Sequence, residues 1–126
     1  MRTRLLITVL ALVLTPAAAA APFKATLTAP THTPKVNAYW FYTIHATRNG
    51  KPIRATVTVQ IVDTFGVVYP VQYDNTTKNI VNKPFTGIFR DYVQFPPESR
   101  GFKVTFRAIV KAPGGKVTLT YWIKPR

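Results

Sequence analysis

Serine and histidine are the side chains of this chain that could act as a nucleophile and its base. The sequence has one serine, Ser99, two histidines, His32 and His45, and no cysteine. A nucleophilic enzyme needs its serine or cysteine beside a base that a third group orients. Ser99 stands in the run Pro-Pro-Glu-Ser-Arg-Gly and not in the G-x-S-x-G context of a nucleophile elbow. We therefore expect no nucleophilic catalysis.

The acidic residues are few and widely spaced in the sequence. There are four acidic residues, and Asp63, Asp74 and Glu98 lie in expected turns or loops. At such positions a solvated surface or capping role is more common than a role as one of the paired carboxylates of a glycoside hydrolase. Asp91 falls within an expected strand, and we expect it to form a cross-strand ion pair with a basic residue. The two histidines are isolated and thiolates are absent, so no zinc, copper or calcium site is expected. The sequence thus predicts a non-enzymatic protein without cofactor or metal.

The beginning of the chain has the three-part layout of a secretion signal. Two arginines precede the apolar run Leu5–Leu14, which leads into the small-residue tract Ala17–Ala21. The apolar run is ten residues long, whereas a membrane-spanning helix needs about 20. We therefore expect a cleavable signal helix at residues 1–20, one domain at residues 21–126, and a secreted or extracytoplasmic location in the cell envelope.

Basic residues dominate the charge of the expected domain. Without Arg2 and Arg4, 15 basic residues stand against four acidic ones, which leaves a net charge of +11. Such an excess attracts polyanions. Outside the cytoplasm these are membrane head groups, anionic cell-wall polymers and acidic polysaccharides, and nucleic acid is the less expected partner. The alternative is that the charge only keeps an exported protein soluble.

The last two expected strands form a hairpin whose register can be derived. The tract Ala112–Gly115 predicts a four-residue loop. Pairing outward from it sets four apolar residues of one strand opposite four of the other, which a wrong register would not do. The expected pairs are Val110 with Val117, Ala108 with Leu119, Phe106 with Tyr121, and Val104 with Ile123.

The same register gathers basic residues on the outward face of this hairpin. Lysines then stand opposite each other, Lys111 with Lys116 and Lys103 with Lys124. Like charges facing each other across strands are destabilising, and an anionic partner would relieve them, with Trp122 as a platform for a sugar ring, a lipid interface or a base. The alternative is that these side chains only extend into solvent. The candidate binding residues are Lys103, Arg107, Lys111, Lys116, Trp122 and Lys124.

The elements that position this hairpin are expected to be strands as well. Apolar and polar residues alternate with period two through most of the domain, which predicts strands and almost no helix. We expect an all-β fold, an antiparallel two-sheet immunoglobulin-like sandwich of about seven strands. The strands outside the hairpins are expected at residues 23–29, 66–73 and 85–95.

An earlier hairpin is predicted at Asn49-Gly50, the strongest short hairpin signal. The expected pairs are Ile44 with Ala55, Tyr42 with Val57, and Trp40 with Val59. The alternative is that the chain crosses here to the other sheet, in which case the apolar phase of both strands holds and the pairing does not. Because no disulfide can form, the core must stabilise the fold alone, and its expected members are Leu27, Trp40, Tyr42, Ile44, Val57, Val59, Val104, Phe106, Leu119 and Tyr121.

The run Trp40–Ile61, which reads WFYTIHATRNGKPIRATVTVQI, contains a strand, an N-G-x-P turn and a valine-rich alternating strand. Gly87 with the strand after it, the corner Pro96–Gly101 and the closing hairpin follow. This pattern resembles the bacterial immunoglobulin-like modules of the invasin type, over most of the expected domain. The resemblance implies an immunoglobulin-like sandwich and a non-catalytic extracellular role.

The expected function is therefore that of a secreted non-enzymatic module that binds an anionic cell-surface polymer, a polysaccharide or a membrane surface. The alternative is a structural or protein-interacting component of the cell envelope. Salt dependence separates the two, because charge-driven attachment weakens as ionic strength rises.

Overall fold

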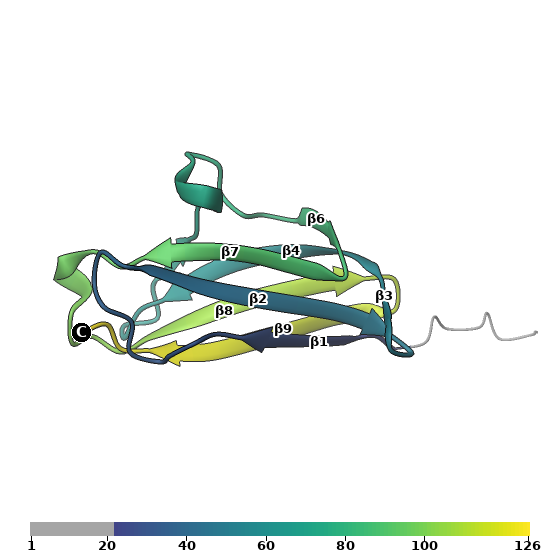
Figure 1. Cartoon of the computed structure of the whole chain (residues 1–126), viewed down its shortest axis with the longest axis horizontal. Helices are drawn as coiled ribbons and strands as arrows, with labels where there is room; N and C mark the ends of the chain where they lie inside the picture. The colour runs from purple at the N-terminus through teal and green to yellow at the C-terminus, as the bar shows by residue number, and fades with distance from the viewer. Residues whose placement is uncertain (1–21) are drawn as a thin grey trace, which may run out of the picture.

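The computed structural model describes residues 22–126 as two antiparallel β-sheets, with strands that run along the long axis of the molecule (Figure 1). The expected signal helix at residues 1–20 lies outside the described residues, as does Ala21. Two short 3-10 helices, η1 (Tyr73–Asn75) and η2 (Pro97–Ser99), interrupt the strands. The strands are β1 (Lys24–Thr28), β2 (Tyr39–Arg48), β3 (Lys51–Pro52), β4 (Arg54–Val62), β5 (Val68–Pro70), β6 (Lys83–Thr86), β7 (Ile88–Gln94), β8 (Val104–Ala112) and β9 (Gly115–Ile123).

The first sheet is built around β2, which pairs with β1 on one side and with β7 and β3 on the other. In the second sheet β4 pairs with β8, which pairs with β9, and the other edge of β4 is shared by β5 and β6. The prediction of an all-β, two-sheet antiparallel sandwich is confirmed.

The turn at Asn49-Gly50 forms, but the long hairpin expected from it does not. Both residues have positive φ, 53° and 74°, as a two-residue hairpin turn of type I′ requires. Only β3 pairs back onto β2, and beyond Pro52 the chain enters the second sheet as β4. The expected pairing of Tyr42 with Val57 and its neighbours is therefore wrong, and the alternative of a crossing is confirmed.

The residues of β2 and β4 that were predicted to face the core do so, although the two strands are not partners. Trp40, Tyr42 and Ile44 are all buried, and so are Val57 and Val59. Residues that face inward from two stacked sheets alternate in the same way as residues that share one face of a hairpin. Alternation therefore identifies the buried face of a strand without identifying the strand beside it.

A second crossing divides the strand expected at residues 85–95. Before Gly87 the chain pairs with β4 as β6, and after it the chain pairs with β2 as β7. The Gly87 N–H donates to the Ile53 carbonyl at 2.9 Å, and the Gly87 carbonyl accepts from the Ala46 N–H at 2.8 Å. The two crossings between the sheets thus run side by side and share hydrogen bonds.

The closing hairpin has the register derived from the sequence. All four expected apolar pairs are present, and Lys111 stands opposite Lys116. Pairing continues to Ala112 and Gly115, so the turn itself is shorter than the expected four-residue loop. At the open end the ladder stops at Val104 and Ile123, one pair short of the expected partners Lys103 and Lys124.

The core lies between the two sheets and contains the expected residues. Seven of the ten are buried, and the other three, Leu27, Leu119 and Tyr121, are half-buried and pack against the core. The reason is position, because β1 and β9 are the edge strands of their sheets. Side chains at the edge of a sandwich have fewer neighbours to cover them.

Candidate functional site

We use the name basic hairpin face for Lys103, Arg107, Lys111, Lys116, Trp122 and Lys124. Alternation along β8 and β9 turns Val104, Phe106, Ala108 and Val110 inward, where they are buried, so the residues between them face outward. Lys111 and Lys116 are direct partners near the turn, whereas Lys103 and Lys124 flank the open end. At about 3.3 Å per residue, Lys103 and Lys111 are roughly 26 Å apart along the strand. The face is therefore a strip with a basic group at each end.

Arg107 lies midway along the strip and is held by a neighbouring strand. Its Nε and Nη2 atoms donate to Oε1 of Gln60 at 3.0 and 2.6 Å, and the two residues are register partners between β4 and β8. The guanidinium is half-buried and fixed in place. The lysines at the two ends are exposed and are freer to meet a partner.

Trp122 is less open than the sequence indicated. One face of its ring stacks on His32, with the ring centroids 4.0 Å apart and the planes 9° from parallel, and His32 Nδ1 lies 2.6 Å from the Trp122 carbonyl oxygen. The Lys103 ammonium lies 5.3 Å from the indole centroid, within cation–π range. Trp122 is still 44% exposed, but one face of its ring is covered by His32, and this stacking attaches the loop before β2 to β9.

Arg54 belongs with this strip, although the sequence did not indicate it. The register pairs Thr56 of β4 with Lys111 of β8, and Arg54 and Lys111 line the same shallow depression beside Pro113. The guanidinium of Arg48 donates to the Pro113 carbonyl at the same turn. Alternation in the sequence predicts that Arg54 faces outward. The sequence paired its strand with β2 and not with β8, however, so it did not indicate that Arg54 lies near Lys111.

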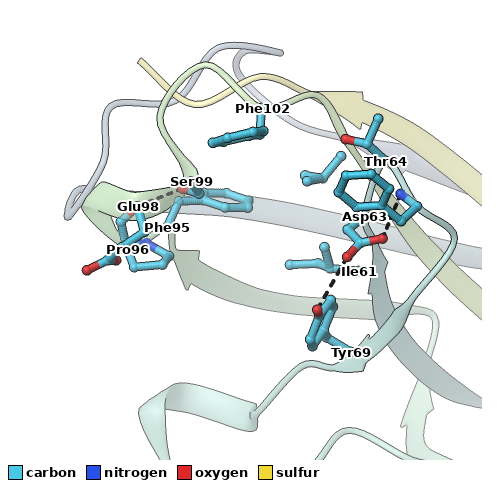
Figure 2. A pocket seen from close by; sticks show the side chains of 11 residues that line it. Ile61, Asp63, Thr64, Tyr69, Phe95, Pro96, Glu98, Ser99 and Phe102 are labelled. Carbon is cyan, nitrogen blue, oxygen red and sulfur yellow. Dashed lines mark hydrogen bonds between the residues drawn. The ribbon is translucent and has the colours of Figure 1, made fainter.

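Figure 2 shows an apolar cavity of about 500 Å³ between side chains at one end of the sandwich. This is the end at which the C-terminus lies in Figure 1. The segment after β4 forms one wall and the corner between β7 and β8 forms the other. The cavity is lined by Ile61, Asp63, Thr64, Phe65, Tyr69, Phe95, Pro96, Glu98, Ser99, Phe102 and Val104. The size is typical of ligand pockets, which span about 300–1,000 Å³.

Asp63 organises one wall of this cavity. Its Oδ1 atom accepts hydrogen bonds from the N–H groups of Phe65 and Val67, both at 2.9 Å, and Tyr69 Oη donates to Oδ2 at 3.3 Å. The carboxylate is thus occupied in holding the turn between β4 and β5, which carries Phe65 outward. Phe65 is 88% exposed.

Two aromatic residues of this cavity stand beside turn glycines in the sequence. Phe65 precedes Gly66 and Phe102 follows Gly101, and both glycines have positive φ. An aromatic residue beside a turn glycine lies outside the period-two pattern of the strands, so that pattern does not predict whether its side chain is buried. The two turns meet only because β4 and β8 are neighbours in the second sheet.

The Ser99 and His32 side chains make contacts within the fold. Ser99 Oγ donates to the Pro96 carbonyl at 2.6 Å within the η2 corner. The His32 ring lies between the rings of Tyr121 and Trp122, and His45 lies on the outer side of β2 opposite Ile88. Within residues 22–126, no group of three or more His, Cys, Asp or Glu side chains is placed to hold a metal. In the same range, no helix is long and apolar enough to span a membrane.

Asp91 is the acidic side chain that the fold buries. It faces inward from β7 and is 6% exposed, and each of its oxygens lies 3.2 Å from the Asp74 N–H. Backbone N–H groups, not a cross-strand cation, hold the carboxylate, which corrects the expected ion pair. Burial raises the pKa of Asp91 above its ordinary value. The hydroxyl of Tyr42, its register partner on β2, is buried without a hydrogen-bond partner among the described residues, and burial and the charge of Asp91 raise the pKa of Tyr42.

We expect an Asp91→Asn variant to be at least as stable as the parent at neutral pH. Because the folded protein binds the Asp91 proton more tightly than the unfolded chain does, stability falls as the pH rises from about 4, the ordinary pKa, through the raised pKa of Asp91. Asparagine stays neutral and still accepts from the Asp74 N–H. The advantage of the variant should therefore be largest at pH 7 and shrink toward about pH 4.

Urea unfolding of both proteins at several pH values measures this difference. Glu98→Gln, which removes an exposed carboxylate, is the control for the change in net charge. If Asp91→Asn is less stable than the parent at pH 7 and recovers in acid, the fold requires the ionised carboxylate and the expectation is wrong.

No protein-family model matches the chain, and no curated protein sequence matches it. Among solved structures, the chain is similar to a DUF4426 family protein from Pseudomonas aeruginosa PAO1. The two share 17% sequence identity with a TM-score of 0.45, over 82% of this chain and 90% of the other.

Proposed function

We propose that this chain is an exported, non-enzymatic module of the cell envelope that attaches to an anionic polymer or surface through the basic hairpin face. One observation carries the proposal: none of the four acidic residues of the chain lies on β8 or β9. Asp91 is buried in the first sheet, and Asp63 is bound within its own turn. The lysines of the face therefore have no carboxylate on their own hairpin to neutralise them.

The pairing of Lys111 with Lys116 supports an external anion as the missing partner. Like charges directly opposite each other on two strands cost a few tenths to about 1 kcal/mol, and Arg54 adds a third cation near this pair. A phosphate or carboxylate group that bridges them would replace repulsion by attraction. Such attachment weakens as salt rises, because exposed charges are screened over about 8–10 Å at physiological ionic strength.

We also infer that the fold is of the immunoglobulin type, as the resemblance to invasin-type modules implies. In that fold strands A, B and E share one sheet, and C, F and G share the other. Assigning β1, β2 and β7 to A, B and E, and β4, β8 and β9 to C, F and G, matches the strand neighbours of this chain. This assignment supports a binding role carried by a rigid scaffold and not by a catalytic cleft.

Reversing two charges of the face tests the proposed function. In a Lys103→Glu, Lys111→Glu variant, each change removes an attraction worth about 1 kcal/mol at an anionic surface and adds a repulsion. We expect the affinity for phosphatidylglycerol vesicles and for soluble polyphosphate to fall by more than about tenfold. Folding should not suffer, because the Lys111→Glu change would place an opposite charge across from Lys116.

The matched control reverses Lys24 and Lys51, which are exposed residues of the first sheet. This variant has the same net charge as the hairpin variant. If both variants bind equally weakly in co-sedimentation, net charge alone accounts for the attachment. If the hairpin variant binds as well as the parent at low salt, the basic hairpin face is not the binding face.

The alternative of a protein-interacting envelope component has one observation in its favour. Tyr39 and Phe41 are each 57% exposed on the outer side of the first sheet, and both pack against Tyr92 with ring centroids 4.7 and 5.6 Å away. Exposed aromatic groups of this kind are common in protein interfaces. Attachment through them would persist at high salt, which separates this function from the first.

A further inference from the structure

Exposed apolar side chains gather at the end of the sandwich where the cavity opens. Phe65 is 88% exposed, Phe102 58%, Tyr69 50% and Val67 47%. Phe65 and Tyr69 come from the turn after β4 and from β5, whereas Phe102 comes from the loop before β8, and all three line the same cavity. We call these four residues the apolar tip. Apolar groups clustered on an otherwise polar surface mark a site of interaction with a protein or a membrane.

Basic residues lie at the same end of the sandwich as the apolar tip, because hydrogen bonds join several segments of the chain there. The Gly101 N–H donates to the Pro125 carbonyl at 2.7 Å, and Thr64 Oγ1 donates to the Lys103 carbonyl at 3.1 Å. The Arg126 N–H donates to the Pro34 carbonyl at 2.9 Å. The cations brought to this end are Lys35, Arg100, Lys103, Lys124 and Arg126.

Two acidic residues at this end, Asp63 and Glu98, stand against these five cations. The Asp63 carboxylate accepts hydrogen bonds from its own turn. Figure 2 shows the Glu98 carboxylate pointing away from the cavity. The end of the sandwich thus combines exposed aromatic side chains with an excess of positive charge.

We propose that the apolar tip inserts into the interface of a lipid bilayer that carries anionic head groups. The proposal rests on the proposed function and names its partner, because the Lys103 and Lys124 end of the basic hairpin face adjoins the tip. Surface-bound proteins combine aromatic side chains, which enter the boundary between head groups and acyl chains, with lysine and arginine, which contact anionic lipids. A dissolved polyanion would use the cations and leave Phe65 in water.

Replacing the two exposed phenylalanines separates insertion from charge attraction. A Phe65→Ser, Phe102→Ser variant keeps every charged residue, and both side chains are exposed, so folding should be retained and is checked by thermal unfolding. We expect the affinity for phosphatidylglycerol vesicles to fall by more than about tenfold, while the affinity for soluble polyphosphate stays unchanged. Phe41→Ser is the matched control, because Phe41 is 57% exposed on the first sheet.

A second measurement reports insertion directly. In a Phe65→Trp variant, vesicles with brominated acyl chains should quench the added tryptophan beyond the quenching of Trp40 and Trp122 in the parent. If quenching equals that of the parent and the serine variant binds vesicles as well as the parent does, the insertion proposal is wrong. If the insertion proposal is wrong but the Lys103→Glu, Lys111→Glu variant still binds more weakly than the parent, the proposed function stands. If that variant also binds as well as the parent, both the insertion proposal and the proposed function are wrong.

A loss of binding to vesicles and to polyphosphate alike in the folded serine variant would also overturn insertion, since it would place the phenylalanines in a site for the anion itself. A loss that Phe41→Ser reproduces would assign the effect to exposed aromatic residues in general. Only a vesicle-specific loss confined to the apolar tip supports a bilayer as the partner.

Discussion

Replacing Trp40 with alanine is expected to lower the free energy of unfolding by about 3–5 kcal/mol. Trp40 is 1% exposed, and its ring packs against Phe106 and Tyr121 of the opposite sheet, with centroids 5.1 and 5.8 Å away. Its Nε1 atom donates to the Thr31 carbonyl at 2.8 Å. The variant would leave a large cavity between the sheets and an unpaired carbonyl beside it.

Trp122→Ala is the matched control for this experiment. Trp122 is 44% exposed and contacts His32 and Lys103 at the edge of the second sheet. Its loss should cost on the order of 1 kcal/mol, the size of a surface stacking contact. Urea unfolding, followed by circular dichroism, measures both variants. A loss below about 1 kcal/mol for Trp40→Ala would exclude Trp40 from the core.

A Gly87→Ala variant is expected to lose about 2–5 kcal/mol of stability, because two costs act at one position. The φ of Gly87 is +73°, a region that costs a residue with a side chain about 1–2 kcal/mol. A Cβ atom there would lie 2.7 Å from the Cβ of Pro52, so the neighbouring crossing between the sheets would have to move, at about 1–3 kcal/mol more.

Gly50→Ala separates the two costs. Gly50 has a φ of +74°, and no heavy atom lies within 4 Å of an added Cβ. It should therefore show the backbone cost alone, and the difference between the two variants measures the steric one. Equal losses in urea unfolding would mean that Pro52 moves aside freely and that the two crossings are not tightly packed.

The sequence by itself determined the closing hairpin and the inward phase of the core strands. Four apolar pairs and a Pro-Gly turn allow one register for the closing hairpin, and β8 and β9 adopt it. The lysines of the basic hairpin face were located in the same way, because a period of two places every second residue on the same side. The inward phase of Trp40 and Val57 was likewise readable from alternation.

Only the tertiary structure decided which strands lie side by side beyond that hairpin. Alternation of apolar and polar residues shows which side chains of a strand are buried. It does not show which strand is the neighbour, because a residue that faces a stacked sheet gives the same pattern as one that shares a face with a hairpin partner. The proximity of Arg54 to Lys111 and the hydrogen bonds between Arg107 and Gln60 follow from the pairing of β4 with β8. The crossing at Gly87 follows from the pairing of β6 with β4 and of β7 with β2. The apolar tip arises from the same pairing, since Phe65 and Phe102 meet only where two distant turns close the same end of the sandwich.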